Sequence, residues 1–154
     1  MSRARKTLYM ETTSIASDRS AAEICAELVK AGANQIATTY KDGRIVGLRW
    51  SMRICGDDRL FDMPVRVDPV FKIINGRRSW PSSHTATDRA QADRVAWRQL
   101  LRWVQAQMAM IDTGMVETAE VFSPYMVGAQ GKTLWEMISE GNMLMLLPAP
   151  EITQ

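Results

Sequence analysis

The fold is decided by the stretch at residues 85–111, TATDRAQADRVAWRQLLRWVQAQMAMI, in which apolar side chains recur at helical spacing. A capping box of Thr85 and Asp88 predicts where this long helix begins, and Gly114 predicts where it ends. One side of the helix is apolar and should face the core: Trp97, Leu101, Val104, Met108 and Ile111. Another side carries a polar stripe, which is either a solvated surface or the functional site: Gln91, Arg94, Arg98, Arg102 and Gln105.

The residues before the long helix predict one shorter helix and two strands. Residues 8–15 are polar and β-branched, typical of an edge strand or an ordered arm, and residues 20–30 form a helix capped by Ser17 or Asp18. The period then changes to two over residues 34–41, and Asp42-Gly43 predicts a tight hairpin turn. In the next strand one set of alternating residues should face the core: Val46, Leu48, Trp50, Met52 and Ile54. The other set should face away: Ile45, Gly47, Arg49, Ser51 and Arg53.

A second turn at residues 55–58 leads to a third strand, which carries Phe61, Met63, Val65 and Val67 on one face. Pro64 lacks a backbone donor, so this strand should lie at the edge of the sheet. Residues 68–74 predict a short helix with proline in its first turn. The long helix must cover the apolar face of the sheet, with Trp97 and Leu101 on Trp50 and Leu48. We therefore predict an α+β fold: a three-stranded antiparallel meander in αβββα order, packed against a long amphipathic helix, with small C-terminal helices.

We expect residues 1–114 to form this αβββα core domain and residues 115–154 to form a helical, acidic C-terminal appendage packed on it. Residues 116–122 predict a short helix, and a capping box at Thr133 and Glu136 predicts another that ends before Gly141. The apolar run at residues 143–147 either completes the core or is covered by another subunit.

Charge is distributed unevenly along the chain, although the net charge is only +2. Residues 1–102 carry 18 Lys and Arg against 11 Asp and Glu, whereas residues 103–154 carry one Lys and six acids. This asymmetry indicates a polyanion-facing first part and an acidic, solvating or partner-facing second part. No apolar run approaches the roughly 18 residues that a membrane span needs, so we expect a cytoplasmic protein without membrane contact.

The sequence offers little for catalysis, and we predict that the protein is not an enzyme and takes no metal or cofactor. His84 is the only histidine, and the two cysteines, Cys25 and Cys55, have no metal-binding spacing. Nucleotide-binding glycine motifs and a Gly-x-Ser-x-Gly nucleophile motif are absent. Asp57, Asp58 and Asp62 could together hold a divalent cation, but acid pairs in hairpin turns are usually turn formers.

Four segments resemble small proteins of unassigned function encoded in tailed-phage and prophage genomes: residues 8–13, 95–103, 111–116 and 120–126. The resemblance implies a bacterial or phage cytosolic setting. Separately, a three-stranded meander backed by a long helix is similar in outline to the core of the Rad52-like and Red-beta-like single-strand annealing proteins, a likeness of fold alone.

Two functional hypotheses follow. The first is a phage nucleic-acid-binding protein, with single-stranded DNA favoured, that acts in recombination or annealing as a homo-oligomer. Its contacts would be cations around a stacking tryptophan: Arg49, Arg53, Arg66, Arg77, Arg78, Trp80, Arg94, Arg98 and Arg102. The alternative is a phage accessory protein that binds a host protein, in anti-defence or replication modulation, without touching nucleic acid. A small virion or assembly component is a third reading. The first hypothesis requires the stripe of Arg94, Arg98 and Arg102 to emerge beside Arg49 and Arg53 or beside Arg77 and Arg78.

Overall fold

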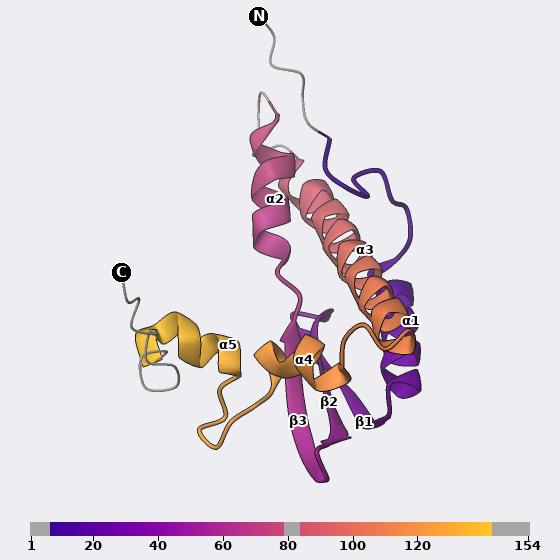
Figure 1. Cartoon of the computed structure of the whole chain (residues 1–154). Coiled ribbons are helices and arrows are strands. Elements are labelled where there is room, and N and C mark those ends of the chain that lie inside the picture. Colours follow the sequence, from indigo (N-terminus) through magenta and orange to yellow (C-terminus); the bar gives the residue numbers. More distant parts are fainter. Residues whose placement is uncertain (1–6, 79–83, 143–154) are drawn as a thin grey trace, which may run out of the picture.

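The computed structural model describes residues 7–78 and 84–142, and it has the predicted α+β architecture (Figure 1). Helix α1 (Ser17–Lys30) leads into an antiparallel sheet of order β1-β2-β3, made of β1 (Ala33–Lys41), β2 (Arg44–Ile54) and β3 (Asp57–Pro64). Helices α2 (Val67–Gly76) and α3 (Thr85–Asp112) follow. The C-terminal part consists of α4 (Thr118–Phe122), η2 (Ser123–Tyr125), α5 (Leu134–Met137) and η3 (Ile138–Asn142).

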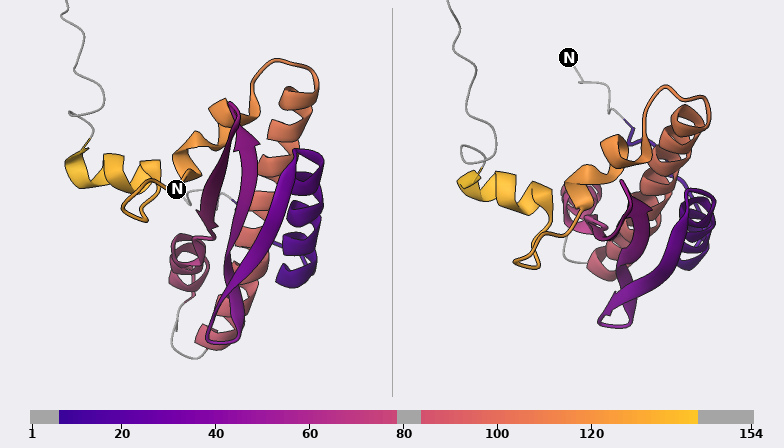
Figure 2. Two further views of the ribbon diagram at one scale, coloured as in Figure 1. Left: turned by 90° about the horizontal axis from the view of Figure 1, so that it is seen from below. Right: turned by 60° about the horizontal axis from the view of Figure 1, so that its bottom comes forward.

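The described residues form two layers, with α1 and α3 side by side on one face of the sheet and none of the described helices covering the other face (Figure 2). The core lies between the layers, where Trp50 stacks on Phe61 with ring centroids 5.2 Å apart. Trp97 and Leu101 are fully buried in the same cluster as Leu48, as predicted. The Trp97 indole N–H also donates to the Ile45 carbonyl oxygen at 3.2 Å, which ties α3 to β2.

Local sequence patterns correctly predicted the first hairpin turn, the edge strand and the positions where two helices begin or end. Asp42 and Gly43 both have positive φ, as a tight hairpin of this kind requires, and β3 is an edge strand. Gly114 adopts φ +74° and donates to the Ile111 carbonyl where α3 ends. The Thr133 and Glu136 capping box forms in both directions, with backbone-to-side-chain distances of 3.2 and 2.7 Å.

The prediction that Ile45 faces away from the core is wrong. Thr39 pairs with Gly47 and Tyr40 pairs with Ile45, so Val46 is an extra residue in β2 without a partner on β1. This bulge reverses the alternation, and Ile45 is therefore buried on the same face as Leu48.

Local predictions also differ from the structure at the starts of the two long helices. Helix α1 has Ala16 as its N-cap, and the Ser17 hydroxyl donates to Asp93 of α3 at 2.5 Å instead of capping its own helix. Asp88 is not the carboxylate of a capping box at the start of α3, because it is 1% exposed and accepts hydrogen bonds from Arg78 and Asn75.

Of the two forms predicted for residues 8–15, an edge strand or an ordered arm, the structure shows the arm. Residues 8–15 form no strand but an arm along α3, where Gln99 donates to the Tyr9 carbonyl and Gln91 to those of Glu11 and Thr13. The second hairpin turn, predicted over residues 55–58, consists of Cys55 and Gly56, because residues 57 and 58 belong to β3. Helix α2 begins at Val67, one residue before the predicted start.

The C-terminal part contributes to the core through Phe122, which is fully buried. Its ring makes edge-on contacts with Trp50 and Trp103, with centroids 5.6 and 6.0 Å away. Val127 donates to the Leu60 carbonyl and so covers part of the outer edge of β3. Helix α5, in contrast, extends sideways from the sheet (Figure 1). In the described ranges, no helix combines the length and apolarity needed to cross a membrane.

Candidate functional site

Arg78, predicted to contact phosphate, binds a buried carboxylate instead. Its Nε lies 2.6 Å and its Nη2 2.5 Å from the two oxygens of Asp88, and the Asn75 amide donates to the same carboxylate at 3.1 Å. The hydrogen bonds from Arg78 hold the pKa of Asp88 below its usual value despite burial. This pairing connects the end of α2 to the start of α3.

Arg77 is engaged in the same region by the N-terminal arm. It donates to the Glu11 carboxylate at 2.5 Å, and the backbone N–H of Leu8 donates to the other oxygen of that carboxylate at 2.7 Å. The Leu8 hydrogen bond and then the Arg77 hydrogen bond lower the pKa of Glu11. Arg77 and Glu11 therefore fasten the arm to the end of α2.

The arginine stripe of α3 is only partly available. Arg98 is 8% exposed and reaches Glu23 of α1 at 3.3 Å. Arg94 donates to the Gln91 amide oxygen, and only Arg102, which donates to Gln105 at 3.1 Å, is plainly exposed. All three cations thus bind side chains of the helical layer, and Arg98 alone among them pairs with a carboxylate of a described residue.

The sheet arginines lie on the opposite layer from that stripe. Arg49 pairs with Asp62 on the neighbouring strand at 2.6 Å, and Arg53 donates to the Gly56 carbonyl at 3.0 Å. Arg66 lies beyond the end of β3, where it precedes α2, and is exposed. Trp80 lies outside the described residues. The arrangement therefore does not place the α3 stripe beside Arg49 and Arg53.

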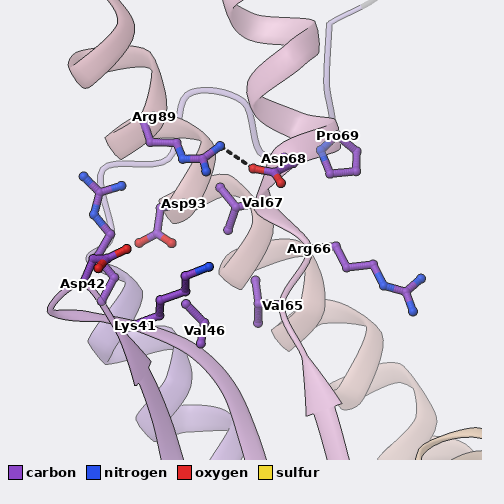
Figure 3. Close-up of a pocket in the computed structure, with 11 residues that line it drawn as sticks. Lys41, Asp42, Val46, Val65, Arg66, Val67, Asp68, Pro69, Arg89 and Asp93 are labelled. Carbon is purple, nitrogen blue, oxygen red and sulfur yellow. Dashed lines mark hydrogen bonds and ion pairs between the residues drawn. The ribbon is translucent and has the colours of Figure 1, made fainter. Parts of the chain in front are cut away.

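A groove of about 730 Å³ lies where the β1–β2 hairpin approaches α2 and α3 (Figure 3). Its aliphatic lining comes from the end of the sheet and the start of α2: Val46, Val65, Val67 and Pro69. Its charged lining carries four bases and three acids: Lys41, Arg44, Arg66, Arg89, Asp42, Asp68 and Asp93. The groove is thus an apolar surface with a rim of both signs.

The charges of the rim differ in what they already bind. Arg89 pairs with Asp68 at 2.5 Å, and Asp93 accepts the Ser17 hydroxyl. Lys41 and Arg44 make no hydrogen bond or ion pair through their side chains with any other residue in the described ranges. Figure 3 shows Lys41 extending toward the middle of the lining residues, whereas Arg66 points away from them.

Sequence reasoning missed Lys41 and Arg44 because it treated the hairpin turn only as a turn. The signal was present, since these two cations directly flank Asp42-Gly43 and are register partners at the end of the ladder.

No group of three or more His, Cys, Asp or Glu side chains within residues 7–78 and 84–142 is placed to hold a metal ion. The carboxylates considered for a divalent cation are engaged in part by arginines, because Asp57 pairs with Arg59 and Asp62 with Arg49. His84 is an exposed residue just before α3.

Comparison of the chain with protein-family models, with curated proteins and with solved structures finds no match.

Proposed function

We propose that this chain is a non-catalytic binding protein whose partner is another protein, bound at the groove beside the β1–β2 hairpin. The observation that carries the proposal is the lining of the groove, which combines an aliphatic surface from Val46, Val65 and Val67 with charges of both signs. Apolar contact surrounded by mixed charge is the chemistry of protein interfaces. A phosphate polymer instead favours cations without acidic neighbours.

The internal pairing of the arginines supports the same choice. Arg49, Arg77, Arg78 and Arg98 each hold a carboxylate of this chain, so a phosphate contact would have to replace an existing ion pair. For Arg78 the exchange would leave the buried Asp88 without its main partner, which costs more than a surface contact returns. Four of the nine residues proposed for nucleic acid are therefore poor phosphate ligands.

Nucleic-acid binding, with single-stranded DNA favoured, is the second candidate, and one observation favours it. Arg44 lines both the groove and a neighbouring hollow of about 310 Å³ that Arg94 also lines. Lys41, Arg44 and Arg94 form no ion pair with other described residues, so these three cations could follow a phosphate backbone.

One experiment separates the two candidates. A photo-crosslinking amino acid replaces Asp42 at the groove or, as the matched control, Lys30 at the exposed end of α1. Crosslinking is carried out in the bacterial cytoplasm, the setting that the sequence resemblance implies. We expect the position-42 probe alone to give a protein adduct, and K41E/R44E to remove it. Labelled single- and double-stranded oligonucleotides are titrated in parallel at low salt.

The protein-partner proposal is refuted if no specific adduct forms and the chain binds oligonucleotide through the three cations. Binding through three phosphate contacts would weaken with salt at a log–log slope of about −2 for a single strand and disappear in R44E/R94E. A protein adduct without oligonucleotide binding supports the first candidate.

A further inference from the structure

The end of the molecule opposite the groove carries a surface of complementary chemistry. Residues 112–120, from the end of α3 into α4, contain Asp112, Glu117 and Glu120 and no Lys or Arg. None of these three acids forms an ion pair with another described residue. Met115, in the turn between the helices, is 71% exposed, the most exposed of the large apolar side chains in the described ranges.

These features match the groove in both charge and polarity. The groove lining includes Lys41 and Arg44, whose side chains pair with no other described residue, together with the valine surface. A methionine side chain adapts its shape to an irregular apolar surface, and acids on either side of it in the sequence would meet these cations. An exposed methionine between carboxylates is therefore a chemically suitable occupant of the groove.

The turn cannot enter the groove of its own chain. Asp93 lines the groove, and Asp112 lies 19 residues further along the same continuous helix, a distance of about 28 Å. Both views in Figure 2 place the β1–β2 hairpin and the turn after α3 at opposite ends of the molecule.

We infer that the occupant is a second copy of this chain, which inserts the 112–120 turn, with Met115 as its apolar anchor, into the groove of its neighbour. This inference rests on the proposed function and names its partner. The two contacting surfaces are different, so the contact is head-to-tail and leaves one groove and one turn free in every dimer. Such a contact propagates into open chains unless the rotation between copies closes a ring.

Sedimentation velocity of the full chain over a concentration series tests the inference with two blocked variants. K41E/R44E blocks the groove, and D112K/M115K blocks the turn while sparing the Glu117 and Glu120 capping box of α4. We expect the wild type to grow beyond dimers with concentration and each variant alone to remain monomeric. An equimolar mixture should form dimers and nothing larger, because it retains one intact groove and one intact turn per pair. Circular dichroism melting confirms that both variants fold.

K30E/K72E serves as the matched control, since it reverses two exposed lysines on α1 and α2 that do not line the groove. It should associate like the wild type, while each blocking variant should weaken association by at least about tenfold and so stay monomeric at the concentrations where the wild type first grows. The inference is overturned if the wild type stays monomeric, if either blocked variant still grows, or if the mixture stays monomeric. In those cases an adduct to a different protein at position 42, lost in K41E/R44E, would still uphold the proposed function.

Discussion

Phe122→Ala tests whether residues 1–114 form a domain that is stable without the C-terminal residues. Phe122 lies outside the predicted 1–114 domain, yet it is fully buried against Trp50 of the sheet and Trp103 of α3. Truncating a buried phenylalanine costs about 3–5 kcal/mol, and two edge-on aromatic pairs account for about 1–3 kcal/mol of that. Small domains have a free energy of unfolding of roughly 5–15 kcal/mol, so this one change should remove a large part of it.

Urea unfolding followed by tryptophan fluorescence and by far-ultraviolet circular dichroism measures the effect. Both signals should shift together to a lower midpoint, because loss of Phe122 opens the core shared by the sheet and α3. Phe71→Ala is the matched control: Phe71 is half-buried, contacts the Arg89 guanidinium at 5.1 Å from its ring centre, and should cost about 1 kcal/mol. A loss below about 1 kcal/mol for F122A would show that residues 1–114 are stable without the C-terminal part and would refute the reasoning.

Three further predictions concern single side chains. Asp88→Asn should lower the melting temperature at pH 7, and the difference from wild type should shrink below about pH 4. The reason is that Arg78 lowers the pKa of Asp88. The stability that the Asp88 carboxylate contributes is therefore present above the ordinary carboxyl pKa and is lost as pH falls through the lowered pKa. Gln91→Ala removes two hydrogen bonds to the arm, at 2.7 and 3.0 Å, and should speed limited proteolysis within residues 7–15, whereas Gln107→Ala should not. Cys55→Gly should raise the free energy of unfolding by about 0.5 kcal/mol and Cys55→Val should lower it, because φ is +51° at this position and glycine tolerates a positive φ better than a β-branched residue does. Equal urea midpoints for the two variants would contradict this prediction.

The fold was predictable where a local pattern decides the structure. The long helix, the Asp42-Gly43 turn and the edge position of β3 each follow from residues close together in the sequence. The burial of Ile45 was not predictable, because alternation alone does not reveal the extra residue at Val46.

The predicted nucleic-acid site was harder to judge from the sequence, because some of its arginines pair with carboxylates far away in the chain. Arg77 and Glu11 are 66 residues apart, and Arg98 and Glu23 are 75 apart, so the sequence gave no sign that these two arginines pair with carboxylates. The groove unites a hairpin tip with the starts and flanks of two helices, and only the tertiary structure brings Lys41 and Arg89 to one cavity.

The bulge at Val46 makes chain length, rather than side-chain chemistry, the strict requirement of the hairpin. Deletion of Val46 would place Gly47 next to Ile45, so the bulge would be lost while Ile45 stayed opposite Tyr40 on the core face. The groove would then lose the valine that the extra residue supplies, and β2 would lose the bend that a bulge introduces. Related sequences that share this groove should therefore keep the same number of residues between Tyr40 and Leu48.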